Sequence, residues 1–77
     1  MPEKKFEIEF LKSLSFTNFC VFRVMHGIRV AGYFSCDFKE AEFRYSIVDN
    51  NCIDDDELYT LAYNYIKNDL KGEPPEE

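Results

Sequence analysis

The chain has 77 residues, of which 45% are apolar, and its formal net charge is −6. Eight Phe and five Tyr supply large buried areas, so one small folded domain is expected and a disordered chain is excluded. No apolar run approaches the ~18 residues of a membrane helix, and charges interrupt the first ten residues, unlike a signal peptide.

From these properties we expect a single domain over residues 1–77, with an ordered core at about 5–71 and an acidic tail at 72–77. We expect a cytoplasmic protein without a membrane partner, located in the host cytoplasm if the gene is viral.

The first element is predicted as a strand, because Phe6, Ile8 and Phe10 alternate with charged residues. A helix over residues 6–12 is the alternative, since Phe6, Phe10, Leu11 and Leu14 also fit one helical face. We favour the strand, with a turn at residues 13–15.

Residues 16–25 and 28–38 read as two strands of a hairpin. A two-residue loop at His26 and Gly27 would turn Arg23 into the core, where an unpaired charge is costly. We therefore predict a three-residue loop at 25–27, with Phe22 opposite Val30. The predicted inner face carries Cys20, Phe22, Val24, Ile28, Val30, Phe34 and Cys36.

Residues 41–47 alternate as a further strand, and residues 49–51 form a polar turn. A helix begins after Asp54, because Glu57 stands three residues later as in a capping box. Its apolar stripe consists of Leu58, Leu61, Ala62, Tyr65, Ile66 and Leu70. Gly72 ends the helix. Tyr59 and Tyr63 lie one turn apart on its flank and fit either the edge of the core or a contact surface.

These elements predict an α+β fold, in which a small antiparallel sheet of three to four strands has one C-terminal helix packed on one face. Cys20, Cys36 and Cys52 form no close pair, and His26 is the only histidine. Neither a disulfide framework nor a zinc site is expected, and we predict three buried thiols, no metal and no cofactor.

The sheet face away from the helix is the first candidate binding surface. The predicted outer face carries Phe19, Val21, Arg23, Arg29, Ala31, Tyr33, Glu42, Arg44, Ser46 and Val48. Arg23 and Arg29 are expected opposite each other, so a nearby acid such as Glu42, a bound anion or a partner should offset them. Because aromatic residues and Arg are enriched in interfaces, we predict a protein-binding patch made by Phe19, Arg23, Arg29, Tyr33 and Arg44.

The second candidate surface is the acidic start of the helix, which contains Asp54, Asp55, Asp56 and Glu57. Residues 39–77 hold eleven acidic and four basic residues, which disfavours direct binding to nucleic-acid phosphates. Such a surface instead steers association with a basic partner, including one whose surface normally binds nucleic acid.

No catalytic signature is present, and we predict that the protein is not an enzyme. A nucleophile needs an oriented base, and His26 is expected at a hairpin tip. The chain contains no phosphate-binding glycine loop and no nucleophile-elbow motif.

In size, acidity and element content the chain is in a general way similar to small phage-encoded inhibitors, including some anti-CRISPR proteins. This resemblance rests on bulk properties, and it implies a stoichiometric inhibitor that occupies a partner's surface. The alternative is a self-assembling structural or adaptor subunit, such as a homodimer. Binding of single-stranded nucleic acid through the sheet face ranks below both.

Overall fold

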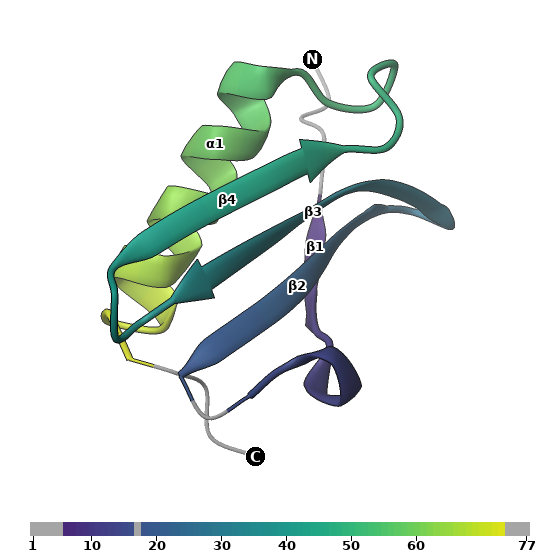
Figure 1. Cartoon of the computed structure of the whole chain (residues 1–77). Coiled ribbons are helices and arrows are strands. Elements are labelled where there is room, and N and C mark those ends of the chain that lie inside the picture. Colours follow the sequence, from purple (N-terminus) through teal and green to yellow (C-terminus); the bar gives the residue numbers. More distant parts are fainter. Residues whose placement is uncertain (1–5, 17, 74–77) are drawn as a thin grey trace.

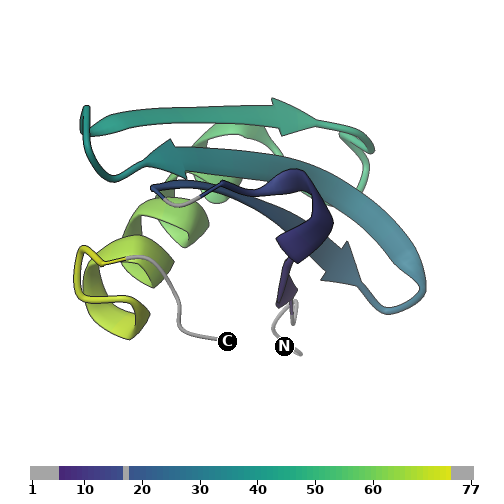
Figure 2. The ribbon, with the colours of Figure 1, turned by 60° about the horizontal axis from the view of Figure 1, so that its bottom comes forward.

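A computed structural model describes residues 6–16 and 18–73, which form a four-stranded antiparallel sheet and one C-terminal helix (Figure 1). The strands are β1 (Glu7–Phe10), β2 (Phe19–His26), β3 (Arg29–Asp37) and β4 (Glu42–Ile47), and their order in the sheet follows the chain. The helix lies on one face of the sheet, and no described element covers the opposite face of β2 to β4 (Figure 2). The predicted α+β fold is confirmed. Most of the expected tail at 72–77 lies outside the described residues.

The first element is a strand, as predicted, and it pairs along its whole length with β2. Ile8 and Phe10 are half-buried toward the helix side, whereas Glu7 and Glu9 are exposed on the other side. A short 3-10 helix, η1 (Lys12–Leu14), makes the turn that was expected at 13–15. The strand form follows from the alternation, because only period two separates these apolar and charged side chains.

The loop between β2 and β3 differs from the prediction. It is a two-residue loop of Gly27 and Ile28, in which Gly27 takes the left-handed conformation (φ +66°) that the first position of such hairpin loops favours. Ile28 is therefore 97% exposed rather than part of the inner face. A bulge follows, so Met25 pairs with Val30 while Val24 pairs with Gly32.

The loop and the bulge together change the register but preserve the faces of β2. Phe22 lies opposite Phe34 instead of Val30, a shift of four residues. Because four is even, Arg23 still points away from the core, as expected. Ala31, predicted on the outer face, is fully buried in the core instead. Val30, predicted on the inner face, is only half-buried.

The helix α1 (Asp55–Asn64) begins at the predicted capping box. Asp54 accepts a hydrogen bond from the Glu57 amide (2.8 Å), and Glu57 accepts one from the Asp54 amide (3.2 Å). A π-helical turn, η2 (Tyr65–Asp69), extends it, and Gly72 (φ +74°) follows the end. Within the described residues no helix is both long and apolar enough to span a membrane.

The core lies between the sheet and the helical stripe that was predicted. Phe22 and Phe34 stack across β2 and β3 with ring centroids 4.8 Å apart, and Tyr65 meets both rings edge-on. The buried core residues are Cys20, Phe22, Val24, Ala31, Phe34, Cys52, Ile53, Leu58 and Ala62. All three cysteines are buried, as predicted, and burial raises the pKa of the Cys20 and Cys36 thiols.

Candidate protein-binding surfaces

The outer face, which is the sheet face opposite α1, has a hollow of about 200 Å³ across β2, β3 and β4. Cross-strand pairing assembles it, because Val21 lies opposite Ser35 and Ser35 lies opposite Arg44. The residues that line it are Phe19, Val21, Tyr33, Phe34, Ser35, Arg44, Tyr45 and Ser46. The structure thus brings the predicted Phe19, Tyr33 and Arg44 together.

The two arginines of this face differ in how firmly they are held. The Arg23 Nε donates to Glu9 Oε1 at 2.9 Å, and a second nitrogen of the same guanidinium also contacts that oxygen. This bond ties β1 to β2 and raises the pKa of the Arg23 guanidinium. Arg44 is 3.6 Å from Glu42, with both side chains more than half exposed. Arg44 is therefore the arginine that can bind a partner at little cost.

Arg29 does not belong to the outer-face patch. It pairs with His26 at the end of the hairpin, and its guanidinium lies 3.2 Å from Asp49. The expected opposition of Arg23 and Arg29 is wrong, because the register shift places Tyr33 across from Arg23. The carboxylate that balances the charge of Arg23 is Glu9 on β1. The sequence did not show that β1 pairs with β2.

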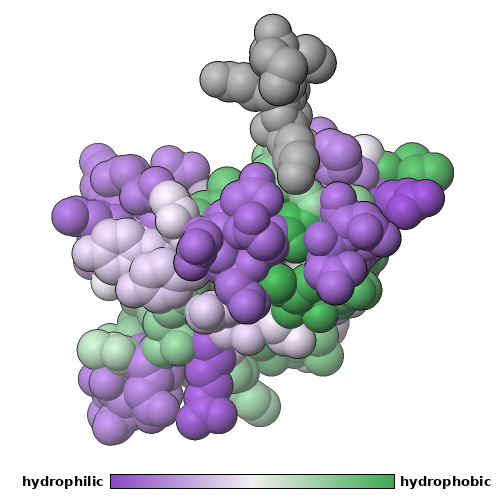
Figure 3. Space-filling view, turned by 90° about the horizontal axis from the view of Figure 1, so that it is seen from above, coloured by the Kyte–Doolittle hydropathy of each residue, from purple (hydrophilic) through white to green (hydrophobic). Residues whose placement is uncertain are grey.

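The acidic start of α1 lies in the helix layer and is separate from the outer-face hollow. Asp54 and Glu57 serve the capping box, and Asp55 and Asp56 are exposed in the first turn. Figure 3 looks down on this end of the molecule and shows hydrophilic side chains spread over it around a smaller apolar area. These carboxylates stabilise the helix start through its dipole and also present negative charge to solvent.

A group of aromatic side chains lies at the β4 edge and includes Tyr59 and Tyr63, which the sequence allowed as either core edge or contact surface. Phe43 and Tyr45 of β4 meet Tyr59 of α1 at ring-centroid distances of 5.5 and 5.9 Å, and Tyr59 stacks on Tyr63 at 6.1 Å. The three tyrosines are between 40% and 48% exposed. The one-turn spacing of Tyr59 and Tyr63 was visible in the sequence, but their placement beside β4 depends on how the helix crosses the sheet.

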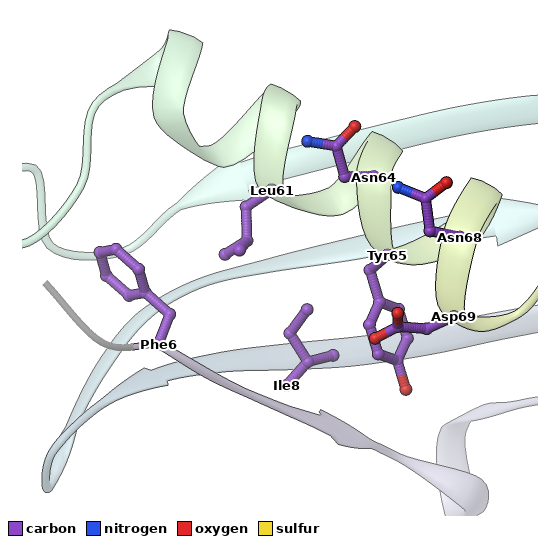
Figure 4. Close-up of a pocket in the computed structure, with 7 residues that line it drawn as sticks. All are labelled: Phe6, Ile8, Leu61, Asn64, Tyr65, Asn68 and Asp69. Carbon is purple, nitrogen blue, oxygen red and sulfur yellow. The ribbon is translucent and has the colours of Figure 1, made fainter. Parts of the chain in front are cut away.

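A groove of about 320 Å³ runs between β1 and the helix (Figure 4). Its apolar side chains are Phe6, Ile8, Leu61 and Tyr65, and its polar ones are Asn64, Asn68 and Asp69. Leu61 and Tyr65 belong to the predicted helical stripe. The groove itself was missed, because no local pattern shows that the helix leaves the inner side of β1 partly open.

Within residues 6–16 and 18–73 no three His, Cys, Asp or Glu side chains come together as metal ligands. No protein-family model, curated protein or solved structure shows significant similarity to this chain.

Proposed function

We propose that the protein binds another protein stoichiometrically through its outer face. The observation that carries this proposal is the hollow of about 200 Å³, around which Phe19, Val21, Tyr33 and Arg44 gather from three strands. Aromatic side chains beside an exposed arginine match the composition of binding hot spots. Because hydrogen-bonded strands hold these residues, little backbone freedom is lost on binding.

More specifically, we propose that the protein is an inhibitor, which occupies a functional surface of its partner as small phage-encoded inhibitors do. The net charge of −6 and the exposed Asp55 and Asp56 support a partner with a basic surface, including one that binds nucleic acid. In this mode the charges increase the association rate, and the apolar hollow supplies contacts that slow dissociation.

The test compares partner capture by three immobilised forms of the full chain. These are the wild type, the outer-face variant Tyr33→Ala/Arg44→Ala, and the control Lys39→Ala/Glu40→Ala in the exposed β3–β4 loop. A lysate of the cells in which the protein is naturally produced is applied to each form, and the bound proteins are quantified by mass spectrometry. We expect one partner at a near-equimolar ratio on the wild type and the control, reduced at least about tenfold on the outer-face variant. Equal capture by all three forms would refute the outer-face proposal.

Self-association is a second candidate, favoured by the aromatic group at the β4 edge. The edge strand β4 carries Phe43 and Tyr45, and Tyr59 and Tyr63 lie beside it on the helix. An exposed strand edge with apolar neighbours can pair with the same edge of another copy. Light scattering across a concentration range tests it. Self-association predicts a mass that rises toward a dimer and falls again in Tyr59→Ser, and a constant monomer mass removes this candidate.

A further inference from the structure

Within the described residues, the edge of β1 that faces away from β2 has no neighbouring strand. The Leu11 amide donates to the Val21 carbonyl at 2.9 Å, which places the pair of Leu11 and Val21 among the hydrogen-bonded pairs. In an antiparallel ladder such pairs alternate with non-bonded ones, so Glu7 and Glu9 also bond to β2. The N–H and C=O groups of Ile8 and Phe10 therefore point to the free edge, beyond which the described chain has no strand.

The groove between β1 and the helix opens beside this edge. Ile8 points into it from β1, and Leu61 and Tyr65 reach down from the helix (Figure 4). Asn64 and Asn68 line the groove one turn apart, and their amides can both donate and accept hydrogen bonds. An apolar floor with a few polar groups, beside a strand that is the edge of the described sheet, has the features of a site for an extended peptide.

The charges around β1 restrict which segment can bind there. Glu7 and Glu9 are exposed on the outer side of β1, and Asp69 is exposed at the groove. A strand laid beside β1 would have one row of side chains next to these glutamates and the other row in the groove. A second copy of β1 is disfavoured, because it would place glutamates against glutamates.

We propose that this groove binds an extended segment of a partner protein, which adds antiparallel to β1 as a fifth strand and alternates apolar with basic side chains. Its apolar residues lie opposite Ile8 and Phe10 and enter the groove. Its basic residues lie opposite Glu7 and Glu9. Backbone hydrogen bonds supply affinity, and the alternation supplies specificity. The site is separate from the outer-face hollow and does not depend on it.

The probe is the synthetic peptide Ac-KVKVKVK-NH2, added to the full-length chain and followed by NMR amide exchange. We expect the Ile8 and Phe10 amides to exchange at least about tenfold more slowly at saturation, because the peptide carbonyls accept their hydrogens. Glu7 and Glu9 amides, already bonded to β2, should change little. Unchanged exchange at Ile8 and Phe10 with millimolar peptide, or protection confined to β4, would overturn the proposal.

Backbone N-methylation of the peptide distinguishes strand addition from non-specific charge attraction. In the antiparallel arrangement the valine amides face β1 and the lysine amides face solvent. Methylating the valine amides should therefore abolish binding, whereas methylating the lysine amides should leave the affinity within about a factor of two. Equal effects of the two methylation patterns would refute the arrangement.

Two protein variants with the same change of net charge provide the matched control. Glu7→Lys places a cation beside the added strand, and Asp55→Lys places one at the exposed start of α1. We expect Glu7→Lys to weaken peptide binding about tenfold and Asp55→Lys to weaken it about twofold or less. Equal losses would mean attraction by net charge alone. The outer-face variant Tyr33→Ala/Arg44→Ala should bind the peptide like the wild type, so this test can fail or succeed independently of the proposed function.

Discussion

The carboxylate of Asp49 makes three side-chain contacts that hold the loop between β4 and α1. Its carboxylate accepts the Asn51 amide at 3.0 Å and the Cys52 thiol at 3.4 Å, and it lies 3.2 Å from the Arg29 guanidinium. These contacts hold the pKa of Asp49 below its ordinary value of 3.8, and the hydrogen bond from the Asn51 amide has the largest effect. The loop that leads into the helix therefore depends on an ionised carboxylate.

Replacing this carboxylate with an amide should destabilise the protein in a pH-dependent way. The stabilisation is complete above pH 3.8, the ordinary pKa, and is lost as the pH falls through the lower pKa of the folded state. We expect Asp49→Asn to melt at a lower temperature than the wild type at pH 7, with the difference shrinking as the pH approaches 2. Thermal unfolding across this range measures it, and a difference that stays constant with pH would contradict the assigned role.

The buried thiols of Cys20 and Cys36 should make stability fall at alkaline pH. Burial raises both pKa values above the ordinary 9.0, so the unfolded chain loses these protons first as the pH rises. The contribution of the two thiols to the free energy of unfolding should therefore be constant up to about pH 8.5 and decline above it. Urea unfolding at pH 8 and pH 10 tests this. In Cys20→Ala/Cys36→Ala the decline should be smaller, and an equal decline would assign it to other groups.

Among the elements, β3 passes close to both the helix and β4 at Gly32. An added Cβ would lie 2.7 Å from the Ser46 carbonyl oxygen and 3.1 Å from Leu58 Cδ2. The first contact is with backbone, which cannot move aside as a side chain can. The bulge at Ala31 and this glycine together let the strand pass under Leu58.

The substitution Gly32→Ala should therefore separate β3 from β4 locally and destabilise the fold by about 1–3 kcal/mol. Ser35→Ala, at a half-buried position of the same strand, is the matched control and should cost less. Urea denaturation of both variants gives the comparison. A Gly32→Ala protein as stable as the control would show that the strands can move apart without cost.

The sequence predicted the elements well because alternation, capping and the helical stripe are local patterns. It also predicted that Phe19, Tyr33 and Arg44 share a face, since a four-residue register error leaves every β2 residue on its own side. Which residues lie opposite one another depends on the hairpin loop and the bulge. The bulge lies at Ala31, next to Gly32, whose backbone passes close to Leu58, and no local pattern contains this tertiary contact. Arg29 was misplaced because the loop lies at Gly27 and Ile28, which pairs Arg29 with His26 instead of Arg23.

At the scale of the whole molecule, the stability of the sheet should decrease toward β1. The central strands β2 and β3 hold the stacked Phe22 and Phe34 under the helix. In the part of the chain that the structure describes, β1 has four residues, one neighbouring strand and a groove where the helix would otherwise cover it. On the outer side its anchor is the bond between Glu9 and Arg23. A strand held in this way can open locally while the remainder of the sheet stays folded.

Native-state hydrogen exchange should show this difference directly. The Glu7 and Glu9 amides should exchange through local opening, with free energies below those of Phe22 and Phe34, whose exchange should require global unfolding. Low concentrations of urea should accelerate exchange at Phe34 but hardly affect Glu9, because little surface is exposed when β1 opens. Arg23→Ala should make β1 amides exchange faster and leave Phe34 within about a factor of two, since the Glu9 contact is at the exposed surface. Equal opening energies for Glu9 and Phe34 would show instead that β1 is part of the cooperative core, and the edge would then be rigid before any partner strand is added.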